Sequence, residues 1–256
     1  MRPVAEQINA RRRPAGQRPA DRSDRPRPFV KWAGGKTQLL SQLLPLLPAD
    51  FESCDTYVEP FVGGGAMLFA ILDRFPNLKR VVINDVSGDV IRTYRAIREN
   101  CPTLIKCLAK LQSAYFELAH EEDRKAYYLT RRDIFNGKTL TDVERAASFI
   151  FLNRTCFNGL YRVNAAGAFN VPFGKAAHPT ICDATLLAKD SMVLANVEIR
   201  NEDFSGLTEF AGRRSFFYFD PPYKPLNATS SFNAYAKGGF TDDDQRRLAA
   251  FCHAID

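Results

Sequence analysis

Four short apolar segments are spaced along the chain, and each ends in a polar or acidic residue. They are TYVEPF, RVVIND, NVEIRN and SFFYFD, at residues 56–61, 80–85, 196–201 and 215–220. Continuous apolar runs of this length are typical of parallel strands that are covered on both faces. Helical patterns follow the first two runs, at residues 65–75 and 87–100. The alternation predicts an α/β fold with an open, doubly wound, Rossmann-like sheet.

The alternation is interrupted from about residue 91 to residue 195, which is too long for a loop of a compact domain. Amphipathic helical patterns cover residues 102–120, 121–135 and 141–151, and a segment rich in glycine and asparagine follows at 153–174. Within that segment, NAAG lies between LYRV and AFNV, which is typical of a β-hairpin. We therefore expect an inserted helical lobe that carries a β-hairpin.

The net charge of +6 is concentrated at the N-terminus, where the first 27 residues hold eight arginines and three acids. Many prolines and few large apolar residues predict a disordered basic tail over residues 1–28. Such a tail is either a non-specific arm for nucleic-acid phosphates or a solvated leader without a role.

The cysteines and histidines do not indicate a metal site. Six cysteines are scattered without a CxxC pair or a zinc-type Cys/His spacing, which predicts buried, reduced thiols and a cytoplasmic protein. The three histidines have no companion at ligand spacing. Three consecutive acids at 242–244 directly follow Thr241, a good capping residue, and indicate a helix start rather than a metal site. No apolar run reaches membrane-spanning length, so we expect neither a metal nor a membrane segment.

The segment FVKWAGGKTQLL contains GGKT, which invites comparison with a phosphate-binding loop. Val30 stands where such a loop needs its first glycine, and the preceding RSDRPRP is not an apolar strand. We therefore do not expect a nucleotide triphosphatase.

Three glycines, Gly63 to Gly65, lie between the first strand and the helix that follows it. Glycines at this turn let a ligand approach the backbone at a helix N-terminus. Asp85 ends the next strand and is placed to accept hydrogen bonds from a ribose diol. Together, these features indicate a nucleoside-type cofactor.

The segment YFDPPY combines an acid, two prolines and a tyrosine at the end of the fourth strand. The prolines lock an extended turn and offer no N–H group. Asp220 and the Pro221 carbonyl can then accept both hydrogens of an exocyclic amine, while Tyr223 supplies a stacking face. An isolated DPP turn is more often only a loop, but its position in this sheet favours the catalytic interpretation.

The motifs KWAGGK, VEPFVGGG, IND, FNGLYRVN with GAFNVPFG, and DPPY occur in this order from about residue 29 to the end. In this respect the chain resembles DNA adenine methyltransferases of the Dam type, the alpha-group amino methyltransferases. The resemblance implies S-adenosylmethionine as cofactor and methyl transfer to the exocyclic N6 amine of adenine in duplex DNA. It also implies a catalytic domain over 29–90 and 195–256, and a target-recognition domain over 91–194.

The resemblance also assigns roles to individual residues. The expected catalytic residues are Asp220, Pro221, Pro222 and Tyr223. The expected cofactor-binding residues are Trp32, Ala33 and Lys36 at the methionine end, Glu59, Phe61 and Gly63 in the glycine loop, Asp85 at the ribose, Asp203 and Phe204 at the adenine end, and Asp220. The expected DNA-binding residues are Lys31, Asn158, Leu160, Arg162, Asn170 and Pro172, with Arg162 reading a guanine edge.

The chain departs from the family pattern in two places. After NVPFG, the family often shows a basic residue and then an aromatic one, whereas Lys175 here is followed by two alanines. GATC stays the leading expectation for the target, but this difference leaves the exact site open. The sequence also ends in the helix after DPPY, before about three strands of the family fold, so we expect an exposed sheet edge and self-association through it. A non-catalytic DNA-binding remnant and a methyltransferase for another amine are the alternatives.

Overall fold

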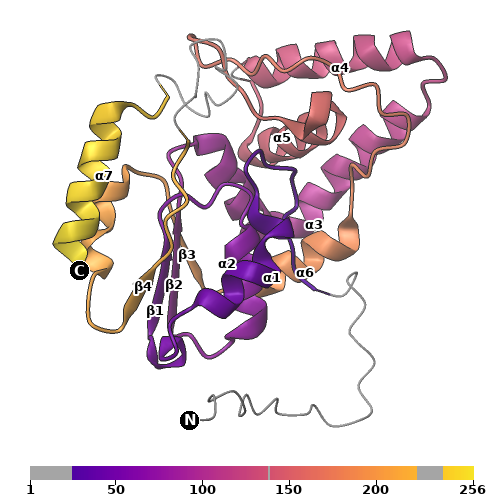
Figure 1. Cartoon of the computed structure of the whole chain (residues 1–256). Helices are drawn as coiled ribbons and strands as arrows, with labels where there is room; N and C mark the ends of the chain where they lie inside the picture. The colour runs from indigo at the N-terminus through magenta and orange to yellow at the C-terminus, as the bar shows by residue number, and fades with distance from the viewer. Residues whose placement is uncertain (1–24, 138, 224–238) are drawn as a thin grey trace, which may run out of the picture.

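A four-stranded parallel sheet forms the centre of the computed structural model, which describes residues 25–137, 139–223 and 239–256 (Figure 1). The strands are β1 (Thr56–Glu59), β2 (Arg80–Asn84), β3 (Val197–Arg200) and β4 (Ser215–Phe217). Each lies within one of the four apolar segments, so the predicted sheet and its parallel direction are confirmed.

The strand order is β3-β2-β1-β4, which places β1 in the interior of the sheet. Thr56 lies opposite both Arg80 on β2 and Ser215 on β4. The chain moves outward from β1 through β2 to β3 and then returns to add β4 on the other side of β1. Ligands bind at such a reversal, beside the carboxyl ends of the strands. The topology therefore directs attention to the loops that follow β1 and β4.

Helices cover both faces of the sheet. They are α1 (Leu40–Leu43), α2 (Ala66–Arg74), α3 (Gly88–Phe116), α6 (Ala184–Leu194) and α7 (Asp242–Ile255). Short 3-10 helices are η2 (Lys36–Gln38), η3 (Leu44–Leu46), η4 (Phe51–Ser53), η5 (Phe157–Gly159) and η6 (Phe204–Phe210). Helices α2, α3 and α6 lie on one face, and α7 with η6 lies on the other (Figure 1).

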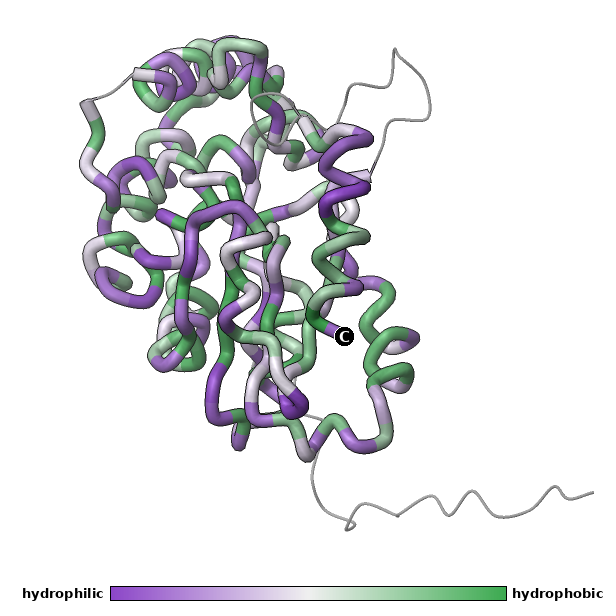
Figure 2. The backbone as a smooth tube through the Cα atoms, turned by 90° about the vertical axis from the view of Figure 1, so that its left-hand side faces the viewer, coloured by the Kyte–Doolittle hydropathy of each residue, from purple (hydrophilic) through white to green (hydrophobic). Residues whose placement is uncertain are grey.

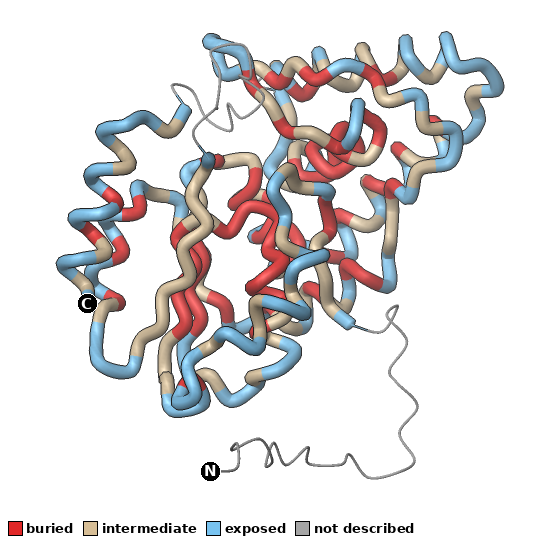
Figure 3. Tube along the Cα trace, in the orientation of Figure 1, coloured by how far each residue is buried: buried red, intermediate tan, exposed pale blue. Residues whose placement is uncertain are grey.

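Successive side chains along each strand point to opposite faces of the sheet and so pack against different helical layers. Val58 and Val82 pack with Phe204, Leu248 and Phe251 under α7 and η6, whereas the neighbouring strand residues join the larger core under α2 and α3. Helix α7 begins in hydrophilic residues (Figure 2), where Thr241 forms a capping box with Asp244. The predicted helix start is confirmed. Buried residues follow the strands and the inner faces of the helices (Figure 3).

Helix α3 consists of two helical segments that meet at a kink. The patterns at 87–100 and 102–120 predict two helices, and the backbone between them is non-helical at Asn100, with φ −134° and ψ 29°. Pro102 lies in the first turn of the second segment, where its missing N–H has no partner to lose. The two predicted helices are therefore present and are joined without a loop.

The inserted lobe consists mainly of α4 (Glu121–Asn136) and α5 (Asp142–Thr155), both beyond the carboxyl edge of the sheet (Figure 1). The following hairpin is less regular than expected. Its arms are joined by isolated antiparallel bridges, Cys156 to Phe173 and Val163 to Phe169, rather than by a continuous ladder. Left-handed backbone at Asn158 interrupts the first arm, and Pro172 offers no N–H in the second.

The apolar core is continuous between the sheet and the lobe. Tyr94 on the first half of α3 and Phe151 on α5 belong to the same buried cluster as Tyr57 on β1. The proposed division into a catalytic and a target-recognition domain stays a prediction, and the two parts share this core. Of the expected tail, residues 1–24 lie outside the described residues. Arg25 and Arg27 pair with Asp73 and Asp183 on the folded part.

Strand β4 is at an edge of the sheet in the described part of the chain. Self-association through this edge stays a prediction. Over the same residues, no helix is both long and apolar enough to cross a membrane.

Gly65 allows the turn from β1 into α2. Its φ is +73°, and a Cβ atom there would lie 2.3 Å from the Tyr94 hydroxyl oxygen. Gly167 also has a positive φ, +82°, but a Cβ atom there would meet nothing within 4 Å. Alanine substitutions at these two glycines therefore distinguish the cost of backbone strain alone from the cost of strain combined with a steric clash.

We expect Gly167→Ala to lower the free energy of unfolding by about 1 kcal/mol, because of strain alone. Gly65→Ala should lower it by about 3 kcal/mol, because the methyl group also displaces Tyr94. Urea unfolding measures both values. The extra cost should shrink in a Tyr94→Phe background, and equal costs for the two alanine variants would contradict this explanation.

Candidate active site

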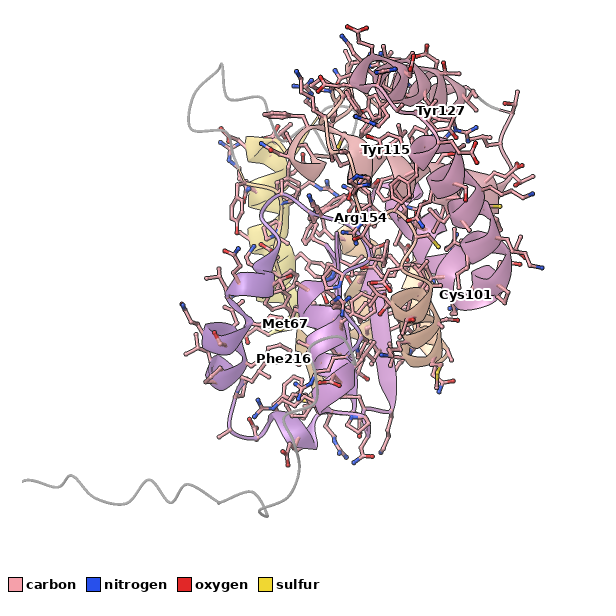
Figure 4. The ribbon with its side chains drawn as sticks, turned by 90° about the vertical axis from the view of Figure 1, so that its right-hand side faces the viewer. Met67, Cys101, Tyr115, Tyr127, Arg154 and Phe216 are labelled. Carbon is pink, nitrogen blue, oxygen red and sulfur yellow. The ribbon has the colours of Figure 1, made fainter. Side chains whose placement is uncertain are left out.

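A cavity of about 640 Å³ lies at the carboxyl ends of β1 and β2 and beside the segment that follows β4. This volume is in the range of sites that enclose small organic ligands. Every residue that the sequence assigns to catalysis or to the cofactor lines this cavity: Trp32, Ala33, Lys36, Glu59, Phe61, Gly63, Asp85, Asp203, Phe204, Asp220, Pro221, Pro222 and Tyr223. Met67 and Arg154 also line it and come from α2 and from the lobe helix α5 (Figure 4).

Glu59 is a buried acid at the end of β1. It is 2% exposed, and its Oε2 accepts a hydrogen bond of 3.0 Å from the Tyr57 hydroxyl. Burial raises the pKa of Glu59 to about 8; the Tyr57 hydrogen bond opposes this rise, and the negative charges of Asp220 and Asp85 add to it. Without a cationic partner, this side chain is therefore protonated near neutral pH.

Asn84 connects the loops that follow three neighbouring strand ends. Its Nδ2 atom donates to the carbonyls of Pro60 and Glu202, both at 3.0 Å. Its Oδ1 atom accepts from the Glu202 backbone N–H, also at 3.0 Å. Asn84 lies in the IND motif, but sequence analysis assigned it no role, because the partners of its amide come from segments far away in the sequence.

Asp85 fixes the glycine loop. Its two carboxylate oxygens accept backbone hydrogen bonds from Gly63 at 3.0 Å and from Ser87 at 2.8 Å. Burial raises the pKa of Asp85 to about 6, although both hydrogen bonds lower it. The expected contact with a ribose stays a prediction, and Asp85 has a structural role in addition.

Trp32 lies directly on the glycine loop. A Cβ atom at Gly63 would come within 2.4 Å of the Trp32 Nε1 atom, and one at Gly64 within 2.8 Å of the Trp32 Cβ atom. The indole also stacks on Tyr161 of the lobe, with ring centroids 5.7 Å apart. The glycines are therefore required for the close approach of the KWAGGK segment, which forms part of the cavity wall.

Lys36 connects the KWAGGK segment to the DPPY segment. Its ammonium group lies 2.5 Å from Asp220 Oδ2 and 2.8 Å from the Gly34 carbonyl. It also lies 5.2 Å from the centroid of the Tyr223 ring. Burial lowers the pKa of Lys36, but hydrogen bonds and charge attraction from Asp220 and Tyr223 outweigh it and hold the pKa above its usual value. The lysine therefore remains a cation beside the expected catalytic acid.

The DPPY segment presents Asp220 and Tyr223 together. The Tyr223 hydroxyl donates to Asp220 Oδ1 at 3.2 Å, so both carboxylate oxygens are held by neighbours. Tyr223 is 57% exposed, which leaves its ring accessible at the cavity rim. An accessible aromatic face beside a fixed carboxylate can receive a flat polar ring.

Aromatic side chains form the opposite end of the cavity. Phe61 lies 5.6 Å from Phe204 and 5.8 Å from Phe240 by ring centroids. Asp203, before Phe204, caps η6 through Ser205 and forms a 2.6 Å ion pair with Arg247 on α7. Sequence analysis missed Phe240, although its place directly before the Thr241 capping box gave a signal.

The DNA-binding candidates divide into two groups. Lys31 lines the cavity, whereas Asn158, Leu160, Arg162, Asn170 and Pro172 lie on the irregular hairpin, outside the cavity wall. Arg162 is held by Asn170, through Nε to the side-chain oxygen at 2.8 Å and through Nη2 to the carbonyl at 3.2 Å. Asn170 thus contacts Arg162 in the structure. Phe157, beside Asn158, is an exposed aromatic that sequence analysis did not consider.

A parallel sheet of this order, with a glycine loop after β1 and an acid-rich cavity at the switch point, defines an α/β fold of the methyltransferase type. Residues 32–256 match the family model of the D12 class N6 adenine-specific DNA methyltransferases. The chain belongs to this family, which confirms the resemblance noted in its motifs. It is an adenine-specific DNA methyltransferase by family.

Named relatives agree with this assignment. The chain is 46% identical to the type II methyltransferase M.MjaIII of Methanocaldococcus jannaschii, over 90% of this chain and 80% of the relative. It is 32% identical to the DNA adenine methylase of Escherichia coli K12, over 90% of this chain and 76% of the relative. It is 36% identical to the DNA N-6-adenine-methyltransferase of Escherichia phage P1, over 88% of this chain and 28% of that longer protein.

The raised pKa of Glu59 predicts how stability depends on pH. The folded state keeps the proton up to about pH 8, whereas the unfolded chain loses it near pH 4.5, so folding binds a proton between these values. Stability from this group therefore falls as pH rises through that window and is constant above it.

We expect the wild type to lose roughly 2–4 kcal/mol relative to Glu59→Gln between pH 5 and pH 8. Urea unfolding of both proteins at several pH values measures the difference. Burial also raises the pKa of Asp190 to about 8. Because Asp190 is present in both proteins, its contribution to the pH dependence cancels in the comparison. A difference that stays constant with pH would mean that Glu59 is already ionised in the free protein.

Proposed function

We propose that the chain transfers the methyl group of S-adenosylmethionine to the N6 amine of adenine in double-stranded DNA, at GATC or a related short site. The observation that carries the proposal is the ion-paired Asp220, held beside the exposed Tyr223 ring in the cavity that also contains the glycine loop. Metal ions are not part of the proposal; the described residues hold no group of three or more potential ligands.

The cavity suits a cofactor that combines a positive charge with a flat base. Asp85, Asp220 and the protonated Glu59 line it, and an ammonium or sulfonium group beside them would favour ionisation of Glu59. Phe61, Phe204 and Phe240 supply aromatic faces at the other end. S-adenosylmethionine, when bound, supplies an electrophilic methyl group.

The residues of the DPPY segment then act on the target amine. Adenine leaves the duplex at a cost of a few kcal/mol and stacks on Tyr223. Asp220 and the Pro221 carbonyl would accept hydrogen bonds from the two amine hydrogens, which would direct the nitrogen lone pair toward the methyl group that the cofactor supplies. Lys36 fixes the Asp220 carboxylate through its 2.5 Å contact, so the acceptor is oriented before the substrate arrives. Positioning and preorganised electrostatics supply the acceleration.

Sequence recognition falls to the hairpin. Asn170 accepts hydrogen bonds from Nε and from Nη2 of Arg162, which limits the rotamers of the guanidinium. Nη1 and the second N–H of Nη2 are left for a bidentate contact with a base edge. Lys31 approaches the target from the cofactor side. We also propose a cytoplasmic location, which agrees with six cysteines that form no disulfides.

Asp220→Ala should reduce methyl transfer about a hundredfold to ten-thousandfold, because the amine loses a positioned acceptor. Transfer of radiolabelled methyl groups to duplex DNA, followed by nucleoside analysis, measures both the rate and the product. Asp133→Ala, which removes an acid exposed on α4, is the control and should keep its rate. A folded Asp220→Ala protein with near-normal activity would remove this carboxylate from the mechanism.

Arg162→Ala should cost about 1–3 kcal/mol of discrimination at one base pair, because a bidentate contact with guanine is lost. The measurement compares affinity for a GATC duplex with affinity for duplexes altered at each position in turn. Alanine substitutions of Arg11, Arg12 and Arg13 are controls that should weaken binding to all sequences alike. Equal losses on matched and scrambled duplexes would instead make Arg162 a phosphate contact.

A further inference from the structure

Asn153, near the end of α5, connects the lobe to the KWAGGK segment through its side chain. It is 2% exposed, so its amide has no access to water. Its Oδ1 atom accepts from the Lys31 backbone N–H at 2.8 Å, and its Nδ2 atom donates to the Lys31 carbonyl at 2.8 Å. The same Nδ2 atom donates to the Gly159 carbonyl at 2.9 Å. One amide thus holds two segments that are far apart in the sequence.

The two segments belong to different parts of the site. Lys31 precedes Trp32, which lies on the glycine loop of the cavity. Gly159 follows Asn158 at the start of the hairpin, where the candidate DNA contacts begin. The Lys31 side chain also crosses Gly159 closely, since a Cβ atom there would lie 2.5 Å from both Cβ and Cδ of the lysine. The loop around Gly159 is therefore in direct contact with Lys31, which lines the cavity beside Trp32.

We propose that Asn153 is a positioning residue that couples the hairpin to the cofactor wall, so that DNA bound at the hairpin changes the affinity of the cavity for its cofactor. An asparagine suits this role because its amide both accepts and donates, and so fixes the N–H and the C=O of one residue. The inference rests on the proposed function, because it assigns the hairpin to DNA and the cavity to S-adenosylmethionine. Coupling of this kind is reciprocal, so the cofactor must strengthen DNA binding by the same factor.

Trp32 provides a readout that does not require activity, because it is the single tryptophan of the chain. It follows Lys31 directly and stacks on Tyr161. A titration of the wild type with a GATC duplex should change its emission, and binding of S-adenosylhomocysteine should tighten about fivefold or more when the duplex is present. Calorimetry gives the two dissociation constants.

Asn153→Ala removes all three hydrogen bonds. We expect it to weaken S-adenosylhomocysteine binding about tenfold or more and to reduce the coupling factor to about one. Gly159→Ala disturbs the same contact from the other side without deleting a polar group, and it should also reduce the coupling. Because Gly159 has a φ of +65°, thermal melts of both variants must show that they are folded at the assay temperature.

Asn136→Ala is the control. Its side chain, at the exposed end of α4, donates to the Phe169 carbonyl at 3.0 Å and accepts from the Phe169 N–H at 2.8 Å, so it holds the second hairpin arm rather than Lys31. It should keep cofactor affinity within about twofold of the wild type.

Three results distinguish the possible outcomes. A wild-type protein that binds no S-adenosylhomocysteine would contradict the proposed function itself. A wild type that binds both ligands without coupling would overturn this inference alone. Folded Asn153→Ala and Gly159→Ala proteins with wild-type coupling would also overturn it, since the contact would then transmit nothing.

Discussion

The buried amide of Asn84 is the contact on which the geometry of the site depends. It joins Pro60, which leads into the glycine loop, to Glu202, which leads into the Asp203–Phe204 turn. These loops leave β1 and β3, the strands on either side of β2, which have no ladder between them. The Asn84 side chain bridges them directly, in addition to the hydrogen bond from the Val62 N–H to the Asn84 carbonyl. The Asn84 amide is buried, and its oxygen and nitrogen both have hydrogen-bond partners. Separating the loops would break these hydrogen bonds and leave buried polar atoms without partners, which costs free energy. The cavity is therefore formed by the folded chain itself.

The second constraint is electrostatic. Glu59, Asp85 and Asp220 line one cavity, and the charges of Asp220 and Asp85 both disfavour ionisation of Glu59. The three acids differ in how their negative charge is avoided or compensated. Glu59 keeps a proton, Asp85 accepts backbone hydrogen bonds, and Asp220 forms an ion pair with Lys36. A cation that enters the cavity would find an acid able to ionise in response. The same arrangement thus keeps the free protein stable and favours a positively charged ligand.

Local signals located the strands, the glycine loop, Asp85 and the DPPY turn, whereas the other cavity residues were expected from the resemblance to a family. Apolar runs define strands, and Gly63 and Gly65 are demanded by positive φ and close neighbours. The remaining features depend on contacts between distant segments and had no local signal. The Lys36–Asp220 ion pair joins residues 184 positions apart. The hairpin that the NAAG turn predicts is present, but the isolated bridges that replace a regular ladder, and the left-handed backbone at Asn158, had no signal in the sequence. The pattern of residues along the chain thus predicted the helices and strands, but not which distant side chains contact each other.

Three asparagines, Asn84, Asn136 and Asn153, make the same pattern of hydrogen bonds in three parts of the molecule. Each uses an amide to fix the N–H and the C=O of another residue, at the strand ends, in the hairpin and at the cavity wall. An aspartate could not donate and a serine could not span both groups, so the choice of residue follows from the hydrogen bonds required. Loops that carry function are usually the least constrained part of a fold. Here the functional loops are fixed by side-chain amides, of which Asn84 and Asn153 are buried, whereas Asn136 lies at the exposed end of α4. The two loops held by buried amides are therefore more constrained than loops usually are.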